Sequence, residues 1–425
     1  MEEGARTDAL YGLITSMGQS TAQSGMVKRY LQAIRAHLGM EVAYVSEFVG
    51  DRTVFREVDA PQLEAMIKVG DSHALDDVYC RHILEGRLPQ LMPDTAAEPL
   101  AASMPITQAV PIGKHVSVPI RLPDGTVHGM FCCLGFKADR SLHERDMQMM
   151  RVFADLTAVE ISRDLDASKA AKEKESRIKT AIEQNQIAMV YQPIWELDGK
   201  RPVGFECLAR FSATPQRSPD RWFAEAAESG LGTLLELTAI RIALSNIALF
   251  PAEVYIAVNA SPTTVLSDEF LDVMNRMPAE RMVLEITEHA HVEDYDSLLK
   301  AIEPLRARGV RLAVDDAGAG YSSLQHILQL QPDLIKLDIG LTRSIDLDPA
   351  RRALASALVS FARETGSHII AEGVETASEL AALRSIGVGK AQGYFLGRPM
   401  QLEAAVRLLG QQEAHRLATA VNSKN

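Results

Sequence analysis

The sequence predicts an α/β barrel of the TIM type, preceded by a smaller α+β domain with an antiparallel sheet. From about residue 180, short apolar strands alternate with amphipathic helical stretches, which is typical of repeated βα units. Several of these strands end in a carboxylate, an amide or a lysine. Before about residue 140, strands occur instead as pairs around turn signals, which favours an antiparallel sheet packed against helices.

The composition is that of an ordinary globular protein. The chain has 425 residues, enough for more than one domain, with 47% hydrophobic and 24% charged residues. The formal net charge of −12 argues against broad electrostatic binding to DNA or to anionic membranes. An anionic substrate is still compatible with this charge, because bound cations can reverse the charge of a local site.

The location expected from the sequence is the cytoplasm. Residues 1–8 lack the basic and apolar regions of a signal peptide, and no apolar run is long enough to span a bilayer. The four cysteines, Cys80, Cys132, Cys133 and Cys207, form no C-x-x-C pair and no disulfide framework. We interpret Cys80 as a buried structural residue and Cys132 and Cys133 as core residues.

The N-terminal domain is expected over residues 10–140. Gly50-Asp51 and Pro123-Asp124-Gly125 are turn signals, and each lies between two apolar segments. The four strands of these two hairpins are predicted at 42–48, 53–58, 115–120 and 127–136.

A helical connector is expected over residues 141–179. Ser141 and Glu144 have the spacing of a capping box at the start of a helix. The segment from 164 to 179 is polar and has few apolar anchors, so it is either a solvated helix face or a parallel dimer helix that carries a signal.

The barrel is expected over residues 180–417. Its strands are predicted at 203–205, 254–258, 282–286, 311–314, 334–337, 368–371 and 393–396. Helices are predicted between them, among others at 234–249, 295–307 and 353–365. An open doubly wound sheet is the alternative, but the glycine-rich phosphate loop that usually follows its first strand is not present.

Polar side chains gather at the predicted strand ends. They are Glu206, Asn259, Glu285, Asp315, Asp316, Lys336, Glu372 and Gln392. One polar strand end is normal, but in a TIM barrel all the C-terminal strand ends converge on one mouth. Together these residues therefore indicate an active site.

The possible ligand atoms indicate hard metal ions. They are carboxylate and amide oxygens, with no Cys or His at the strand ends, which suits Mg²⁺ or Mn²⁺ and disfavours zinc. The adjacent Asp315 and Asp316 can serve two ions, one of them as a bridge. Two such ions can clamp the attacking and leaving oxygens of an in-line phosphoryl displacement.

Several side chains have individual roles in this prediction. Lys336 can orient a water molecule or offset phosphate charge, and Glu372 is the best candidate for accepting the proton of that water. Glu206, Leu208 and Arg210 share one face of an extended segment. Arg210 can therefore contact a substrate phosphate beside Glu206, although a salt bridge that stiffens the barrel mouth is the alternative.

A flexible loop is expected after Asp316. Gly318, Gly320 and two serines follow, so the loop can reshape as metal and substrate bind, with an ordinary turn as the alternative. Glu288, three residues after Glu285, is expected to tether this loop by hydrogen bonds.

These motifs, in this order, resemble the EAL-domain family of cyclic di-GMP phosphodiesterases over about residues 180–409. The matching segments are Tyr191–Ile194, Glu206–Arg210, Val258–Pro262, Leu284–Glu288, Asp315–Leu324, Ile335–Asp338, Ala371–Glu375 and Gln392–Tyr394.

The resemblance implies hydrolysis of one phosphodiester bond of cyclic di-GMP to linear pGpG with two Mg²⁺ or Mn²⁺ ions. It assigns metal binding to Glu206, Asn259, Glu285, Asp315, Asp316 and Glu372. It places Lys336 and Glu372 around the nucleophilic water. Substrate contacts are assigned to Arg210, Leu208, Gln392 and Asp338.

The chain departs from the family pattern at two places. Cys207 stands where the family has its signature alanine and is expected to point away from the metal face. Ala317 and Ala319 replace a phenylalanine and a threonine, which removes no ligand but bears on loop packing, dimer coupling and turnover.

The N-terminal domain resembles a GAF domain, a common small-molecule sensor, in its element order and in the stretch 79–93. Its ligand cannot be read from the sequence, and no G-G-[DE]-E-F segment of a cyclase is present. The expectation is a homodimeric phosphodiesterase that its GAF domain regulates. The alternatives are a catalytically silent cyclic di-GMP receptor and a different metal-dependent barrel enzyme with Lys336 as its base.

Overall fold

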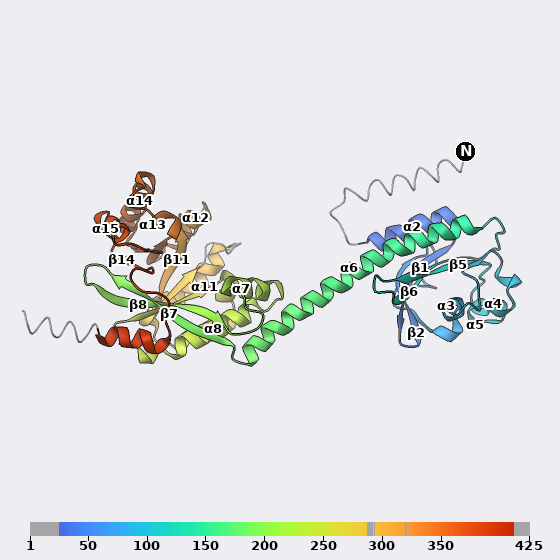
Figure 1. Ribbon diagram of the computed structural model, residues 1–425, viewed down its shortest axis with the longest axis horizontal. Helices are drawn as coiled ribbons and strands as arrows, with labels where there is room; N and C mark the ends of the chain where they lie inside the picture. The colour runs from blue at the N-terminus through green and yellow to red at the C-terminus, as the bar shows by residue number, and fades with distance from the viewer. Residues whose placement is uncertain (1–24, 287–291, 293, 319–320, 412–425) are drawn as a thin grey trace, which may run out of the picture. The chain divides into compact units, whose positions relative to one another are not determined.

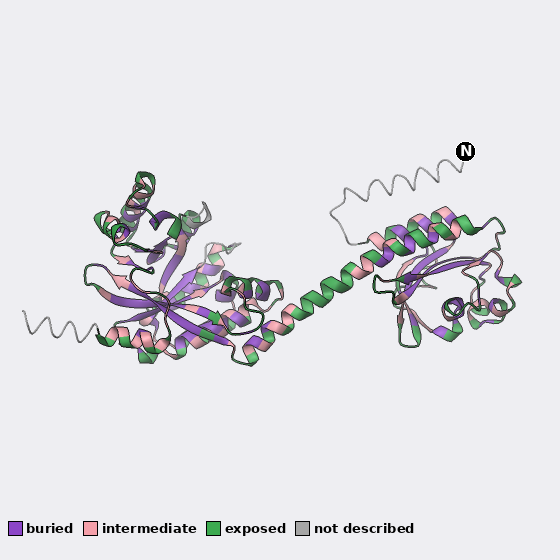
Figure 2. Cartoon of the chain, viewed as in Figure 1, coloured by how far each residue is buried: buried purple, intermediate pink, exposed green. Residues whose placement is uncertain are grey.

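The structure is a computed structural model that describes residues 25–286, 292, 294–318 and 321–411 (Figure 1). The chain divides into two compact units between Ala170 and Ala171, and each unit has its own buried clusters. The strands of both units are largely buried (Figure 2).

The first unit is built on a six-stranded antiparallel sheet with the order β3-β2-β1-β6-β5-β4. The two predicted hairpins are confirmed, with Gly50 and Gly125 at positive φ in their turns. The strands are β1 Val42–Val49, β2 Arg52–Asp59, β3 Ser72–Ala74, β4 Leu91–Met92, β5 Lys114–Arg121 and β6 Val127–Gly135.

Helices cover both faces of this sheet, and β6 shows why. Phe131 and Cys133 face the helices α2 (Met26–Leu38) and α6 (Glu144–Glu183), whereas Met130 and Cys132 face the opposite cluster, because neighbouring strand residues point to opposite sides. That second cluster includes Cys80 of α3, so Cys80, Cys132 and Cys133 are core residues, as expected. The short helices on the second side are α3 Tyr79–Leu84, α4 Pro99–Ser103 and α5 Pro105–Ala109.

The start of α6 differs from the prediction. The helix begins at Glu144, and the hydroxyl of Ser141 donates to Asp139 instead of capping the helix. The reciprocal bond comes from Asp146, whose Oδ2 accepts from the backbone N–H of His143 at 3.0 Å. The carboxylate of Asp139 competes for the serine, and the sequence pattern alone does not reveal that competition.

The second unit contains a closed eight-stranded barrel with the order β10-β11-β12-β13-β14-β7-β8-β9. The TIM-type prediction is confirmed with one difference, since β7 runs antiparallel to both of its neighbours, β8 and β14. The strands are β7 Ile187–Glu196, β8 Arg201–Phe211, β9 Tyr255–Ala260, β10 Met282–Ile286, β11 Arg311–Ala317, β12 Leu334–Leu337, β13 His368–Ala371 and β14 Lys390–Ala391.

The last predicted strand, at 393–396, is wrong. Gly393–Leu396 forms a turn, in which the backbone N–H groups of Leu396 and Gly397 both donate to the carbonyl of Gly393. The apolar Tyr394 and Phe395 suggested a strand, yet their side chains are 53% and 49% exposed. The strand that closes the barrel is the shorter β14 just before this turn.

Helices surround the barrel. They are α7 Pro219–Glu228, α8 Gly232–Ser245, α9 Pro262–Val265, α10 Asp268–Asn275, α11 Tyr295–Ala307, α12 Tyr321–Leu330, α13 Ile339–Thr342, α14 Pro349–Thr365 and α15 Ala377–Ser385. Within the described part of the chain, the segment Gly232–Leu249 alone is long and apolar enough to cross a membrane. Its helix α8 packs on β7 and β9 and buries Leu235, Ile240 and Leu244, as the core helix of a barrel does.

The barrel interior is layered. An apolar layer is formed by Ala257, Val283, Ala313, Leu334 and Ile370. Each of these residues comes two positions before one of the predicted site residues, so side-chain alternation places the site in the next layer toward the C-terminal strand ends. Tyr255, two positions before Ala257 in β9, packs directly against Gly204 of β8. A larger residue than glycine would not fit there, because a Cβ at position 204 would lie 2.4 Å from the ring of Tyr255.

Candidate active site

Seven polar residues lie near or directly after the C-terminal ends of consecutive barrel strands, and an eighth, Glu206, lies in the middle of β8. Glu206 lies in β8, Asn259 in β9, Glu285 in β10 and Lys336 in β12. Asp315 and Asp316 lie in β11, and Glu372 and Gln392 directly follow β13 and β14. Parallel pairing brings these ends to one mouth, as the sequence predicts.

Lys336 is the centre of this layer. Its ammonium nitrogen lies 2.8 Å from both Glu285 Oε2 and Glu372 Oε1. It also lies 3.2 Å from Asp315 Oδ1 and 3.5 Å from Glu206 Oε1. One fully buried ammonium thus contacts four carboxyl groups from four different strands, so protons or further cations must balance the remaining negative charge.

The protonation of these groups follows from their burial. Burial raises the pKa of Glu285 to about 8, against the lowering effect of Lys336, and Glu206 and Asp315 add to the rise. Burial also raises the pKa of Glu372, again opposed by Lys336. Burial alone would lower the pKa of Lys336, but the surrounding carboxylates outweigh it and hold that pKa well above its usual value.

Amide side chains hold the carboxylate of Glu206 in place. Asn259 donates to Oε1 at 3.2 Å and Gln392 donates to Oε2 at 2.5 Å. Gln392 donates also to Gln192 of β7 at 3.0 Å, and Gln192 in turn donates to the carbonyl of Gly397. The antiparallel strand β7 therefore helps to hold the carboxylate of Glu206 in place through Gln192 and Gln392.

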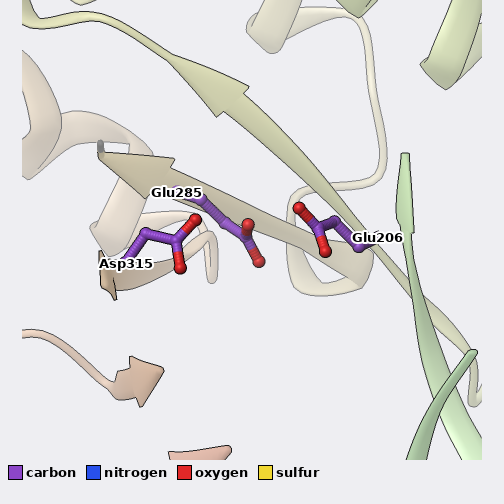
Figure 3. Close-up of side chains that lie close together, drawn as sticks. All are labelled: Glu206, Glu285 and Asp315. Atoms are coloured by element: carbon purple, nitrogen blue, oxygen red, sulfur yellow. The ribbon is translucent and has the colours of Figure 1, made fainter. Parts of the chain in front are cut away.

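Two groups of oxygens have the spacing of metal ligands. Atoms of Glu206, Glu285 and Asp315 lie within 4.8 Å of one another, and the three side chains point into a common space (Figure 3). Asp315, Asp316 and Glu372 form the second group.

Two unpaired oxygens fit this interpretation. Asn259 Oδ1 and Glu285 Oε1 are buried and have no hydrogen-bond partner in the described part of the protein. Such oxygens are costly to bury alone, and a hard divalent cation would satisfy both.

The backbone brings the two aspartates together at the end of β11. Asp316 has a φ of 54°, and its backbone N–H donates to Asp315 Oδ1 at 2.9 Å. The left-handed conformation interrupts the alternation of the strand, and the ladder to β12 shifts register between Val314 and Ala317. This local irregularity lets two consecutive carboxylates serve one mouth.

The comparisons with known proteins now identify the barrel. The family model of the EAL domain matches residues 175–399, more than half of the chain. The chain belongs to the EAL domain family. The first unit matches the family model of the GAF domain over residues 21–162.

Curated relatives share the EAL part of the chain. The cyclic di-GMP phosphodiesterase NbdA of Pseudomonas aeruginosa is 31% identical over 247 residues, 55% of this chain and 32% of NbdA. The bifunctional diguanylate cyclase/cyclic di-GMP phosphodiesterase MucR of the same organism is 30% identical over 239 residues, 53% of this chain and 35% of MucR. This chain therefore matches about a third of the length of these relatives.

A solved structure shows the same fold. The crystal structure of an EAL domain protein from Listeria monocytogenes EGD-e superposes with a TM-score of 0.50. The match covers 55% of this chain and 96% of that chain, at 23% identity.

Of the residues expected to contact substrate, Gln392 touches the carboxylate of Glu206 in the EAL domain, whereas Leu208, Arg210 and Asp338 have no hydrogen bond to the four carboxylates around Lys336 among the described contacts. Along β8, Glu206 is buried, Leu208 is half-buried and Arg210 is exposed, so this face rises from the metal groups toward solvent. Arg210 donates to the neighbouring carbonyl of Ala209. Asp338 caps α13 by accepting from the backbone N–H of Gly340 at 2.7 Å.

The structure describes two of the three residues that depart from the EAL pattern. Cys207 is buried in the cluster between the barrel and its helices, and Ala317 is fully buried in the same cluster. Neither side chain joins the acidic groups. Ala319, Gly320 and Glu288, which was expected to tether the loop, lie outside the described residues.

Two supporting residues of the EAL domain were missed by the sequence analysis. Gln192 lies in an unpredicted strand, although its motif was part of the resemblance. Glu379 is 4% exposed and accepts from the backbone N–H groups of Ser344, Glu375 and Thr376. Its carboxylate thereby fixes the segment that follows Glu372. The capping-box pattern of Thr376 with Glu379 was the available signal.

Proposed function

We propose that this chain hydrolyses one phosphodiester bond of cyclic di-GMP to give linear pGpG, with Mg²⁺ or Mn²⁺. The observation that carries the proposal is the set of four carboxylates around Lys336, together with the unpaired oxygens of Asn259 and Glu285. The names of NbdA and MucR supply the substrate class.

We assign the two acidic groups to two divalent ions. Glu206, Asn259, Glu285 and Asp315 would hold the first ion, and Asp315, Asp316 and Glu372 the second. Bound Mg²⁺ or Mn²⁺ would polarise phosphoryl oxygens and lower the pKa of water.

The side chains of the protein would orient the water and the substrate and would neutralise the charge that develops on the phosphoryl group. Glu372 would accept the proton of the attacking water, and the ammonium of Lys336, 2.8 Å from Glu372 Oε1, would hold that carboxylate in place. The buried ammonium would also offset the charge that develops on the phosphoryl oxygens. Arg210, with Leu208, Gln392 and Asp338, would position the dinucleotide above this layer.

Regulation is the second part of the proposal. The GAF unit would bind a small molecule and change the turnover of the EAL domain, and two copies of the chain would form a homodimer. A GAF domain in the same chain supports the regulatory role.

The decisive experiment is incubation of the full chain with cyclic di-GMP and Mn²⁺, followed by chromatographic identification of the products. Formation of pGpG that stops with EDTA is expected. Asp315→Asn should abolish turnover, whereas Glu228→Gln, on the exposed surface of α7, should retain it. Binding of cyclic di-GMP without any pGpG would contradict the hydrolase and favour the silent receptor.

A further inference from the structure

A cavity of about 140 Å³ lies in the GAF unit, between one face of the sheet and the segments packed on it. Its lining comes from the five strands β1, β2, β3, β5 and β6, from α3 and α5, and from the segment between β2 and β3. The residues that matter here are Tyr44, Phe55, Leu63, Tyr79, Ile106 and His115. Apolar cavities of roughly 150 Å³ accept a molecule of the size of benzene, so this space holds about one aromatic ring.

The lining favours an aromatic ring. Tyr44 and Phe55 lie with their ring centroids 4.4 Å apart, and Tyr79 meets His115 edge to face at 4.9 Å. Rings arranged in this way present both faces and edges to a further ring, which adds to the gain from apolar burial.

One buried polar atom of a lining residue has no hydrogen-bond partner among the described residues. His115 is 2% exposed, and its Nδ1 has no hydrogen-bond partner within the described residues. The hydroxyl of Tyr79, by contrast, is already bonded to Thr107. A ligand with one hydroxyl or N–H group would satisfy the imidazole nitrogen, which otherwise carries the cost of burial without a partner.

The charge of the lining excludes an anionic ligand. Asp71 is an acidic residue of the lining, and none of the described residues that line the cavity is an arginine or a lysine. Lys114 in β5 is occupied by Asp139 and by the carbonyl of Gly39. A phosphate or carboxylate would therefore lose its hydration without gaining a cation. Size and charge together exclude a cyclic nucleotide.

We propose that the GAF unit binds a neutral, single-ring aromatic molecule with one polar group, such as a phenol, in this cavity, with His115 as its hydrogen-bond partner. The binding site stands on its own geometry. Its effect on turnover rests on the proposed phosphodiesterase function.

The test is calorimetric titration of the full chain with phenol, benzoate and cyclic AMP. We expect saturable phenol binding, and binding of benzoate and cyclic AMP weaker by about tenfold or more. His115→Leu should weaken phenol binding by about fivefold or more. His128→Leu, a half-buried histidine of β6 that does not line the cavity, should leave it unchanged.

Two cavity-filling variants keep the test decisive if one fails to fold. Val78→Phe and Ile106→Trp place added volume into the cavity, and each folded variant should lose phenol binding. No saturable phenol binding, tighter binding of benzoate or cyclic AMP, or equal phenol affinity in the folded filling variants would overturn the proposal. The calorimetric titration measures phenol binding without any enzymatic activity. Absence of pGpG formation would therefore contradict the proposed phosphodiesterase function and would leave the proposed phenol site untouched.

Discussion

The ammonium nitrogen of Lys336 lies 2.8 Å from Glu285 Oε2, and both side chains are fully buried. This pair joins β10 and β12 across the intervening β11, whose Asp315 completes the contact. The pair has a structural and a chemical consequence. It neutralises part of the buried acidic layer, and it holds the carboxylates at the positions from which they would bind cations.

Removal of the ammonium should destabilise the protein in the absence of divalent ions. Lys336→Met leaves four carboxylates without their common partner, and breaking a buried ion pair in this way typically costs about 3–5 kcal/mol. Urea denaturation in EDTA would measure the loss, and Mn²⁺ should restore part of the stability.

The matched control for this variant is Lys174→Met. Lys174 pairs with Glu228 at 2.7 Å on the exposed surface, where such pairs contribute about 1 kcal/mol or less. If Lys336→Met were as stable in EDTA as Lys174→Met, the neutralising role of Lys336 would be wrong.

Metal affinity should rise with pH. With a pKa of about 8, Glu285 holds a proton below that pH, and an ion that binds there must release it. The affinity for Mn²⁺ should therefore increase between about pH 6 and 8, by up to about tenfold per unit, and level off above.

The same shift has the opposite sign for the metal-free protein. A carboxyl whose folded pKa is raised stabilises the fold below its unfolded pKa, and this contribution is lost as the pH rises through about 8. Urea denaturation in EDTA at several pH values would measure this loss of stability.

The proton that metal binding releases can be counted by calorimetric titration with Mn²⁺ in buffers of different ionisation enthalpy. Glu285→Gln should lower the number of protons released, and an unchanged number would contradict the assignment of the raised pKa to Glu285.

The chemistry and the binding of substrate should separate by mutation. Glu372→Gln should lower kcat by about 10²–10⁴-fold, as expected for a lost proton acceptor. Arg210→Ala, on the exposed end of the same β8 face as Glu206, should chiefly raise KM. Steady-state kinetics with cyclic di-GMP gives both constants. A parent kcat in folded Glu372→Gln would refute the role of this carboxylate.

Gln192 should act as a positioning residue for the first metal group. Gln192→Leu removes the acceptor that orients Gln392, which in turn holds Glu206. Losing such an outer partner typically weakens metal affinity by about 10–100-fold. Titration with Mn²⁺ would show this loss, and the exposed Gln184→Leu should behave like the parent. Equal affinity in both variants would reduce Gln192 to a packing role.

The sequence predicted the acidic layer because its signals are local. Glu285 and Lys336 each end a short apolar strand, so alternation and the convergence of barrel strands place them together. What it missed depends on contacts between distant segments. The antiparallel direction of β7 follows from its hairpin with β8, but closure of the barrel needs its pairing with β14, some two hundred residues away by the Ala391–Trp195 register. Gln192 supports the site only because it accepts a hydrogen bond from Gln392, which is also distant in the sequence.

The same limit explains the errors around α6. The helical spacing of Met150, Phe153, Leu156 and Val159 is compatible with an apolar seam between two copies of the helix, yet Phe153 is buried against Tyr30 with ring centroids 5.8 Å apart. Helical periodicity shows that a face is apolar, but it does not show what covers that face. A charge at Phe153 would therefore disrupt the core of the GAF unit.

The last prediction concerns where an independent EAL domain begins. Ile178 and Ala181 at the end of α6 are fully buried in the barrel cluster, and Arg177 pairs with Glu225 of α7 at 3.0 Å. A fragment that starts at Thr180 loses Ile178 and Arg177, whereas one that starts at Ala171 keeps both. We expect the longer fragment to be more stable by about 2–4 kcal/mol, of which burial of Ile178 supplies about 1.5–3 kcal/mol. Urea denaturation of both fragments measures the difference, with Ile178→Ala in the longer fragment as the link between them. Equal stability of the two fragments would show that this end of α6 is not part of the barrel's own fold.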